Sequence, residues 1–262
     1  MAGLLETKGV NVRFGGHHAV RDVDLEVAAG QITGLIGPNG AGKTTMFNVI
    51  TGLQESTGKV VLDGHDISGL PPHKRARKGI ARTFQRLEVF GSMTAYENVL
   101  TAAEIHRSWS GDKEDPRAVT ESILQRIGIE AVADDRVDAM PTGQARLVEL
   151  GRALATKPRV LLLDEPASGQ DDAETESFAA LLLALAHDGM AILMVEHDVA
   201  LVMQVCAYIH VLDFGAILAT GTATEIQQNR LVLDAYLGAA EEESSLEHAE
   251  MHALTSDAGS EA

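Results

Sequence analysis

The hydrophobic pattern of the 262-residue chain changes character along its length. Residues 31–36, 160–163 and 191–195 form short, largely apolar runs, which are typical of strands buried on both faces of a parallel sheet. Residues 172–187 have the length of a helix and lie between the last two runs. Strands that alternate with helices predict an α/β fold with a mainly parallel sheet and crossover helices.

A different pattern near the N-terminus predicts antiparallel strands. A strand is expected at 19–27, where residues 21–27 alternate charged and apolar side chains, as in a strand with one buried face. Residues 59–62 are followed by Asp63-Gly64, a typical hairpin turn. We therefore expect an antiparallel β subdomain beside the core. Further strands are expected at 4–10, 12–14, 80–84, 208–213 and 216–219, and further helices at 46–50, 71–78 and 199–206.

Between residues 87 and 155 the strand patterns stop. Three helical stretches follow one another here, at 94–108, 116–127 and 144–155. This block is interpreted as a helical subdomain inserted into the α/β core. The core and β subdomain would then comprise residues 1–86 and 156–240.

A glycine-rich segment joins the apolar run at 31–36 to the helical pattern at 46–50. It matches the phosphate-binding loop, in which two glycines flank four residues before Lys and Ser/Thr. Glycines let backbone N–H groups approach phosphate oxygens, and the helix N-terminus adds partial positive charge. A glycine-rich turn without a ligand is the alternative, but the complete pattern in this context favours a nucleotide site. The segment is Gly37-Pro38-Asn39-Gly40-Ala41-Gly42-Lys43-Thr44-Thr45.

Individual side chains of this loop have separate expected roles. Lys43 can reach the β- and γ-phosphates, and the Thr44 hydroxyl can coordinate Mg²⁺. Thr45 belongs to the same nucleotide-binding set, although its hydroxyl is expected to serve the helix. The sequence therefore predicts that the chain binds a nucleoside triphosphate with Mg²⁺.

Charge and composition narrow the possible environments. The net charge of −17 argues against non-specific nucleic-acid binding, which relies on basic surface. Residues 241–262 contain seven acids and no Lys or Arg, so we expect a disordered acidic tail. Apolar runs stay shorter than the roughly 18 residues of a membrane span, and no signal-peptide pattern is seen. The single cysteine, Cys206, excludes an internal disulfide and suits a cytoplasmic location.

Two acids follow the apolar run at 160–163. Asp164 would lie at the carboxyl edge of the sheet, where it can hold Mg²⁺, and Glu165 could activate water as a general base. An exposed acidic turn is the alternative. His197, after the run at 191–195, could donate a hydrogen bond to the γ-phosphate, and Gln85 could touch Mg²⁺ or the attacking water. Ordinary surface or loop positions are the alternatives for these two residues.

Taken in order, these motifs resemble those of an ABC-type ATPase over about residues 4–238. This resemblance implies a P-loop NTPase fold with a RecA-like core, an antiparallel β subdomain and an inserted helical subdomain. It also implies that ATP closes a head-to-tail dimer and that hydrolysis resets it. The matching motifs are the phosphate loop, Gln85, Gly143-Gln144, Asp164-Glu165-Pro166, Ser168-Gly169-Gln170-Asp171 and His197.

The resemblance assigns further residues to the partner's nucleotide. The signature motif here is Met140-Pro141-Thr142-Gly143-Gln144, in which Pro141 replaces the usual serine. Thr142, Gly143 and Gln144 would still offer backbone groups and a helix N-terminus to phosphate. Asp171 matches an acid that communicates across the dimer. Phe14 lies where the family often stacks an aromatic ring on adenine; an ordinary strand-end aromatic is the alternative.

Four segments, together with the proline-containing signature at 140–144, resemble the ATPase subunits of branched-chain amino acid importers. That resemblance implies a second ABC ATPase, identical or related, two transmembrane permease subunits and an extracytoplasmic solute-binding protein as partners, without nucleic acid. The chain would then be peripheral at the inner face of the cell membrane. Export, a non-transport ABC ATPase and a weakly hydrolysing member of a heterodimer stay open as alternatives. The segments are residues 12–16, 82–85, 195–198 and 234–238.

Overall fold

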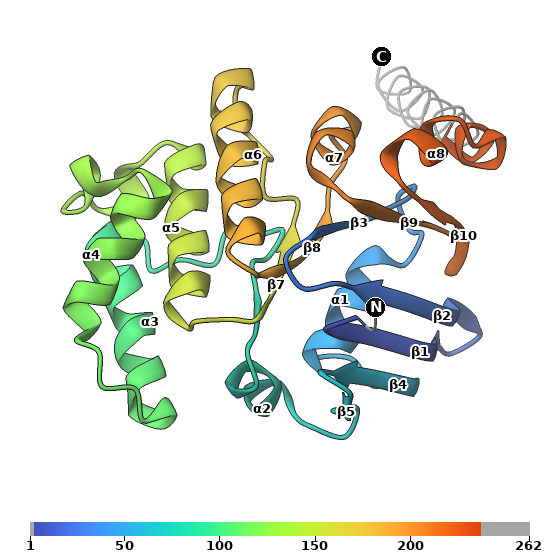
Figure 1. Ribbon diagram of the computed structural model, residues 1–262, viewed down its shortest axis with the longest axis horizontal. Coiled ribbons are helices and arrows are strands. Elements are labelled where there is room, and N and C mark those ends of the chain that lie inside the picture. The colour runs from blue at the N-terminus through green and yellow to red at the C-terminus, as the bar shows by residue number, and fades with distance from the viewer. Residues whose placement is uncertain (1–2, 237–262) are drawn as a thin grey trace, which may run out of the picture.

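The computed structural model describes residues 3–236, which form two sheets and the helices around them (Figure 1). The larger sheet has the strand order β10-β9-β3-β8-β7-β6 and is parallel except for the pair β9–β10. The smaller sheet has the order β2-β1-β4-β5 and is antiparallel. The strands are β1 (Leu5–Phe14), β2 (His17–Val27), β3 (Ile32–Ile36), β4 (Thr57–Leu62), β5 (His65–Asp66), β6 (Ile80–Arg82), β7 (Val160–Asp164), β8 (Ala191–Val195), β9 (Tyr208–Asp213) and β10 (Ala216–Gly221).

Helices cover both faces of the larger sheet (Figure 1). Two short 3₁₀ turns, Glu130–Val132 and Val137–Ala139, precede α5. The helices are α1 (Lys43–Thr51), α2 (Pro72–Arg77), α3 (Ala95–Ser110), α4 (Pro116–Ile127), α5 (Thr142–Ala155), α6 (Asp172–His187), α7 (Val199–Val205) and α8 (Ala223–Gln227).

Alternating side chains of the parallel strands enter two different cores. On β7, Leu161 and Leu163 join the core under α6 and α7, whereas Val160 and Leu162 join the core shared with α1 and the smaller sheet. Successive strand side chains point to opposite faces, so a continuously apolar strand fits a sheet that is covered on both sides. Because both faces of the sheet are packed, the carboxyl ends of its strands, which the predicted site residues follow, are held in place.

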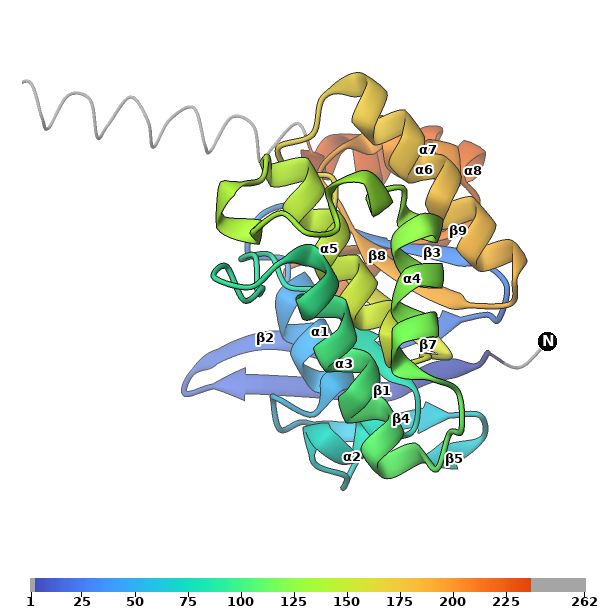
Figure 2. The same ribbon diagram turned by 90° about the vertical axis from the view of Figure 1, so that its left-hand side faces the viewer.

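The helices α3, α4 and α5 pack on one another beside the sheet, and Figure 2 looks onto this group. A capping box at Thr94 and Glu97 starts α3, and the Asp115 side chain caps α4. Both helices end at a glycine in the left-handed region, Gly111 and Gly128. These local signals explain the expected helical block; its boundaries at 87 and 155 stay a prediction.

The mainly parallel sheet, the antiparallel strands and the α/β class are confirmed. The strands expected at 4–10 and 12–14 are one strand, β1, because a bulge at Gly9 (φ 57°) shifts its register without ending it. The short helix α8 was not predicted. Every helix within residues 3–236 is too short or too polar to cross a membrane. The acidic segment 241–262 and residues 237–238 of the importer-like ending lie outside the described residues.

Candidate nucleotide-binding site

The phosphate loop runs from the end of β3 to the start of α1. Gly40 (φ 77°) and Gly42 (φ 106°) have left-handed backbones that glycine adopts without strain. A Cβ at Gly37 would lie 1.9 Å from the Leu212 carbonyl oxygen, so only glycine fits where the loop passes β9. Since Gly42 is the N-cap of α1, the loop leads directly into a helix N-terminus. The loop therefore has the backbone path that phosphate binding requires.

Lys43 folds back over this loop. Its side chain is buried, and Nζ donates hydrogen bonds to the carbonyl oxygens of Gly37 (2.6 Å) and Pro38 (2.9 Å). Burial lowers the pKa of Lys43, while the carboxylates of Glu165 and Asp164 act in the opposite direction. The ammonium group therefore lies against the loop, within electrostatic range of the two acids. The neighbouring Thr44 side chain is exposed on the first turn of α1.

Asp164 ends β7 and is almost completely buried. Its Oδ2 forms a 2.7 Å ion pair with Arg82 of β6, which also donates to Asn48 Oδ1 of α1 (2.6 Å). The Arg82 guanidinium lies 5.3 Å from the Phe47 ring centroid and 4.8 Å from that of Phe84. A single arginine thus joins the acid to α1 and to the strand that leads to Gln85.

Three predicted residues meet at the end of β7. Gln85 Nε2 donates to both carboxylate oxygens of Glu165 at 3.1 Å, and His197 Nε2 lies 2.7 Å from Glu165 Oε1. Glu165 has a left-handed backbone (φ 50°), and its N–H donates to the Val195 carbonyl of β8. Because β7 and β8 are adjacent and parallel, their following residues emerge side by side.

The three residues predicted to hold Mg²⁺ all carry oxygen donors. Asp164 offers a carboxylate, Thr44 a hydroxyl and Gln85 an amide oxygen, which is the hard donor set that Mg²⁺ prefers. Asp164 lies close enough to Lys43 to affect its pKa. The residues present are therefore chemically suited to a nucleotide-bound Mg²⁺.

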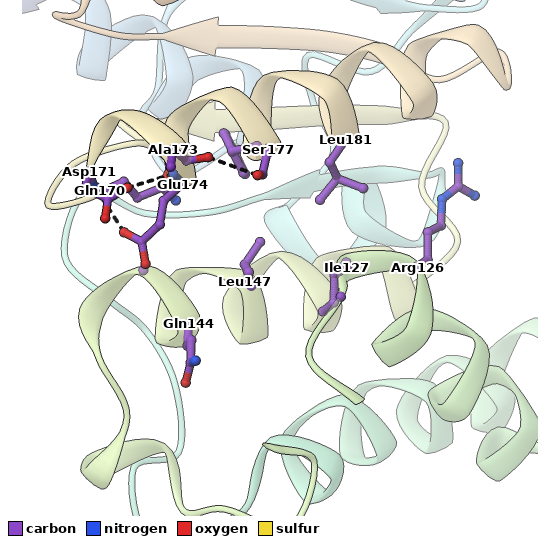
Figure 3. Close-up of a pocket in the computed structure, with 13 residues that line it drawn as sticks. Arg126, Ile127, Gln144, Leu147, Gln170, Asp171, Ala173, Glu174, Ser177 and Leu181 are labelled. Carbon is purple, nitrogen blue, oxygen red and sulfur yellow. Dashed lines mark hydrogen bonds between the residues drawn. The ribbon is translucent and has the colours of Figure 1, made fainter. Parts of the chain in front are cut away.

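The signature residues lie beside α6. Gly143 and Gln144 line a cavity of about 470 Å³ together with Gln170, Asp171 and Glu174. In Figure 3, Glu174 points toward the first turn of α5 and Gln144 points away from α6. A Cβ at Gly143 would lie 3.0 Å from both Glu174 carboxylate oxygens, which favours glycine.

The residues that start α5 and α6 have structural roles of their own. Pro141 is the N-cap of α5 and makes no side-chain capping bond. Asp171 caps α6 by accepting a hydrogen bond from Glu174 N–H at 2.8 Å. A structural role thus accompanies its expected role at the dimer interface.

Phe14 ends β1 and is half-exposed, beside the two-glycine turn into β2. This β1–β2 hairpin lies against the phosphate loop, because a Cβ at Gly42 would meet the Ala19 carbonyl oxygen of β2 at 2.6 Å. The ring is therefore free to receive a base, while the ordinary strand-end interpretation also fits.

Sequence reasoning missed the residues of α5 that hold the Gln85 loop. Arg146 donates to the carbonyl oxygens of Phe84 (2.8 Å) and Gln85 (2.6 Å). Glu149 is buried and accepts from the N–H groups of Phe84 (3.1 Å) and Glu88 (3.3 Å). The available signal was an Arg and a Glu three residues apart, with Glu149 on the apolar side of the expected helix.

Comparison with known proteins identifies the family. Residues 20–168 match the ABC transporter family model, and residues 216–242 match that of the branched-chain amino acid ATP-binding cassette transporter. The chain is 41% identical to the high-affinity branched-chain amino acid transport ATP-binding protein BraF of Pseudomonas aeruginosa, covering 90% of this chain and 98% of BraF. It is 40% identical to LivG of Escherichia coli K12 over the same shares. The lipopolysaccharide export protein LptB of Haemophilus influenzae is 34% identical, with 90% of this chain and 97% of LptB covered.

Solved structures agree with these matches. The ADP form of the ATP-binding cassette MJ1267 superposes with a TM-score of 0.79 at 30% identity, covering 91% of this chain and 100% of that cassette. A dimeric MJ0796 cassette bound to ADP and phosphate gives 0.74 at 26% identity, with 84% and 98% covered. The chain therefore belongs to the ABC transporter family as an ATP-binding cassette ATPase.

Proposed function

We propose that this chain hydrolyses ATP to power an importer of branched-chain or similar hydrophobic amino acids. The observation that carries the proposal is the contact of Gln85 and His197 with Glu165, next to Asp164 and Lys43. This arrangement suits the attack of one water molecule on a γ-phosphate. The importer assignment is supported by the matches to BraF and LivG.

The residues then divide the tasks of binding and hydrolysis among them. Lys43 and the loop amides bind the β- and γ-phosphates, and Glu165 accepts a proton from the attacking water. Gln85 and His197 orient the water and the γ-phosphate. Asp164, with Thr44 and Gln85, would hold Mg²⁺, which would neutralise phosphate charge. Phe14 stacks on the adenine ring.

The site is completed by a second cassette, identical or related. Thr142, Gly143 and Gln144 of one protomer face the nucleotide held by the other, and Asp171 lies at the junction. The dimeric MJ0796 cassette supports this arrangement. ATP favours the closed dimer because it binds that state more tightly than the open one. Hydrolysis removes ATP, so the dimer reopens.

An apolar groove is suited to the permease subunits. It has a volume of about 470 Å³ and is lined by α2, β6, α3 and α5 residues. Leu53, Phe84 and Ile105 line it and are exposed, unlike most large apolar side chains. An apolar segment of a permease would cover them and would hold the chain at the inner face of the membrane, with the solute-binding protein on the other side.

Glu165→Gln tests the catalytic assignment. The variant should keep ATP affinity within a few-fold and lower kcat at least about 100-fold, because the amide cannot accept the proton. Steady-state hydrolysis and equilibrium binding of a fluorescent ATP analogue measure the two quantities. The exposed Glu121→Gln change on α4 is the matched control and should alter neither. Near-normal turnover of Glu165→Gln would refute the general-base role.

Co-purification of the membrane subunits followed by transport assays tests the importer assignment. Proteoliposomes should take up leucine, isoleucine or valine with wild-type protein and ATP, but not with Glu165→Gln. Outward movement of a lipid would instead favour an export role like that of LptB.

A further inference from the structure

Glu196 is a buried acid between β8 and His197, and the roles assigned above do not use it. Only 6% of its surface is exposed. Carboxylates are costly to bury unless hydrogen bonds replace the lost water. Glu196 has such hydrogen bonds, to backbone N–H groups of two loops.

The Glu196 carboxylate joins two loops. Oε1 accepts a hydrogen bond from Ala167 N–H at 2.8 Å, in the loop that follows β7. Oε2 accepts from His197 N–H at 3.0 Å, in the loop that follows β8. These two amides lie within two residues of Glu165 and His197, the side chains that meet in the site.

The carboxylate continues the junction between β7 and β8 beyond the end of the sheet. The last main-chain bond between them is Glu165 N–H to the Val195 carbonyl oxygen, at 2.9 Å. Past that point, Ala167 N–H bonds to the side chain of the other loop instead. Burial raises the pKa of Glu196, whereas its bonds to the amides of Ala167, His197 and Asp198 act in the opposite direction.

We propose that Glu196 is a positioning residue for hydrolysis, which holds the loops of Glu165 and His197 at a fixed separation. The 2.7 Å contact between Glu165 and His197 then depends on Glu196 as well as on the sheet. This inference rests on the proposed roles of Glu165 and His197. It assigns Glu196 no contact with ATP or water.

Glu196→Gln tests the inference with minimal change of shape. The amide keeps one acceptor oxygen but turns an NH₂ group toward a backbone N–H, so one loop must be released. We expect kcat to fall at least tenfold while the KM for ATP stays within threefold, because the Lys43 loop is untouched. A kcat within twofold of wild type, or a parallel loss of ATP affinity, would overturn the proposal.

Asn98→Asp is the matched control. Asn98 is also fully buried and joins a loop to a helix, through Phe90 N–H, the Phe90 carbonyl and the Thr94 carbonyl, but it lies in the α3 region. The Asp variant places a carboxylate oxygen against the carbonyl oxygens of Phe90 and Thr94, so it should lower thermal stability and leave kcat within twofold. An equal fall of kcat in this control would show that general destabilisation explains the Glu196 result, which overturns the proposal.

Hydrogen exchange on the wild-type protein decides the matter if Glu196→Gln does not fold. The Ala167 and His197 amides should exchange at least about 100-fold more slowly than unstructured amides; exchange at the unstructured rate would overturn the proposal. The turnover of Glu165→Gln, measured by steady-state hydrolysis, separates a failure of the proposed function from a failure of the role of Glu196. Retained turnover in Glu165→Gln refutes the proposed function, whereas its loss with normal Glu196→Gln turnover refutes only the role of Glu196.

Discussion

Arg82 balances the charge of Asp164 at the buried centre of the site. Side-chain exposure is only 5% for Arg82 and 2% for Asp164. A buried ion pair contributes little net stability when intact, but removal of one partner leaves an uncompensated charge. Arg82 also reaches Asn48 of α1, so the same side chain links the acid to the helix that starts at Lys43.

Arg82→Met should therefore lower the unfolding free energy by about 3–5 kcal/mol, because Asp164 remains buried without its partner. Urea denaturation near pH 7 measures this change. The control is Arg159→Met, which breaks the pair with Asp63 that is half-exposed on both sides. Water screens that pair, so its loss should lower the unfolding free energy far less. Equal losses in the two variants would contradict the importance of burial.

Residue chemistry was predictable where it followed a local motif. Lys43, Asp164 and Glu165 stand at fixed positions relative to an apolar strand or a glycine loop, so their places at one edge of the sheet could be predicted; their catalytic and binding roles stay predictions. Arg82 and Glu196 could not be predicted in this way. Glu196 bonds to Ala167, 29 residues away, and Arg82 pairs with Asp164, 82 residues away, and nothing in either spacing indicates a contact.

At the scale of elements, α5 is attached to the loop that carries Gln85. Arg146 binds carbonyl oxygens of this loop, and Glu149 binds its N–H groups. Arg146 and Glu149 also pair with each other at 3.2 Å. The helix that begins at the signature motif therefore holds the glutamine of its own protomer's site in place.

Glu149→Ala should release this loop. Two part-buried N–H groups and Arg146 lose their partner, so we expect the unfolding free energy to fall by about 2–4 kcal/mol. Turnover should also fall several-fold, since Gln85 loses its support. Denaturant titration and steady-state hydrolysis measure the effects, with exposed Glu121→Ala as the control. Unchanged turnover would mean that Gln85 is positioned without α5.

The helices and strands were largely predictable because their signals are local. The bounds of α4, α6 and β8 match the expected ranges, since capping residues and apolar runs mark their ends. The continuity of β1 was not predictable, because only its pairing with β2 shows that the strand continues past the bulge at Gly9. The attachment of α5 to the Gln85 loop also depends on packing and has no local signal.

At the scale of the whole molecule, the signature residues line a cavity beside α6, whereas the phosphate loop borders β3, β9 and the β1–β2 hairpin. The signature residues and the phosphate loop therefore border different elements of the chain. This separation supports the proposed head-to-tail dimer, in which each half is completed by the other protomer.

ATP should accordingly drive association of Glu165→Gln, which retains the nucleotide. Light scattering should show monomer without nucleotide and dimer with ATP, either alone or with a related cassette. Lys43→Ala is the control and should stay monomeric, because it removes the ammonium group proposed to bind phosphate. Persistent monomer at saturating ATP with every partner cassette supplied would contradict the half-site arrangement.

The sequence by itself determined the ATPase motifs, the α/β class and most elements, because glycine spacing, apolar runs and capping residues act over a few neighbouring positions. Tertiary structure alone decided which side chains meet. Gln85 and His197 lie 80 and 32 residues from Glu165, and they reach it because the strand order places β6 and β8 on either side of β7. Strand order results from long-range burial of the whole sheet, which no local pattern of residues specifies.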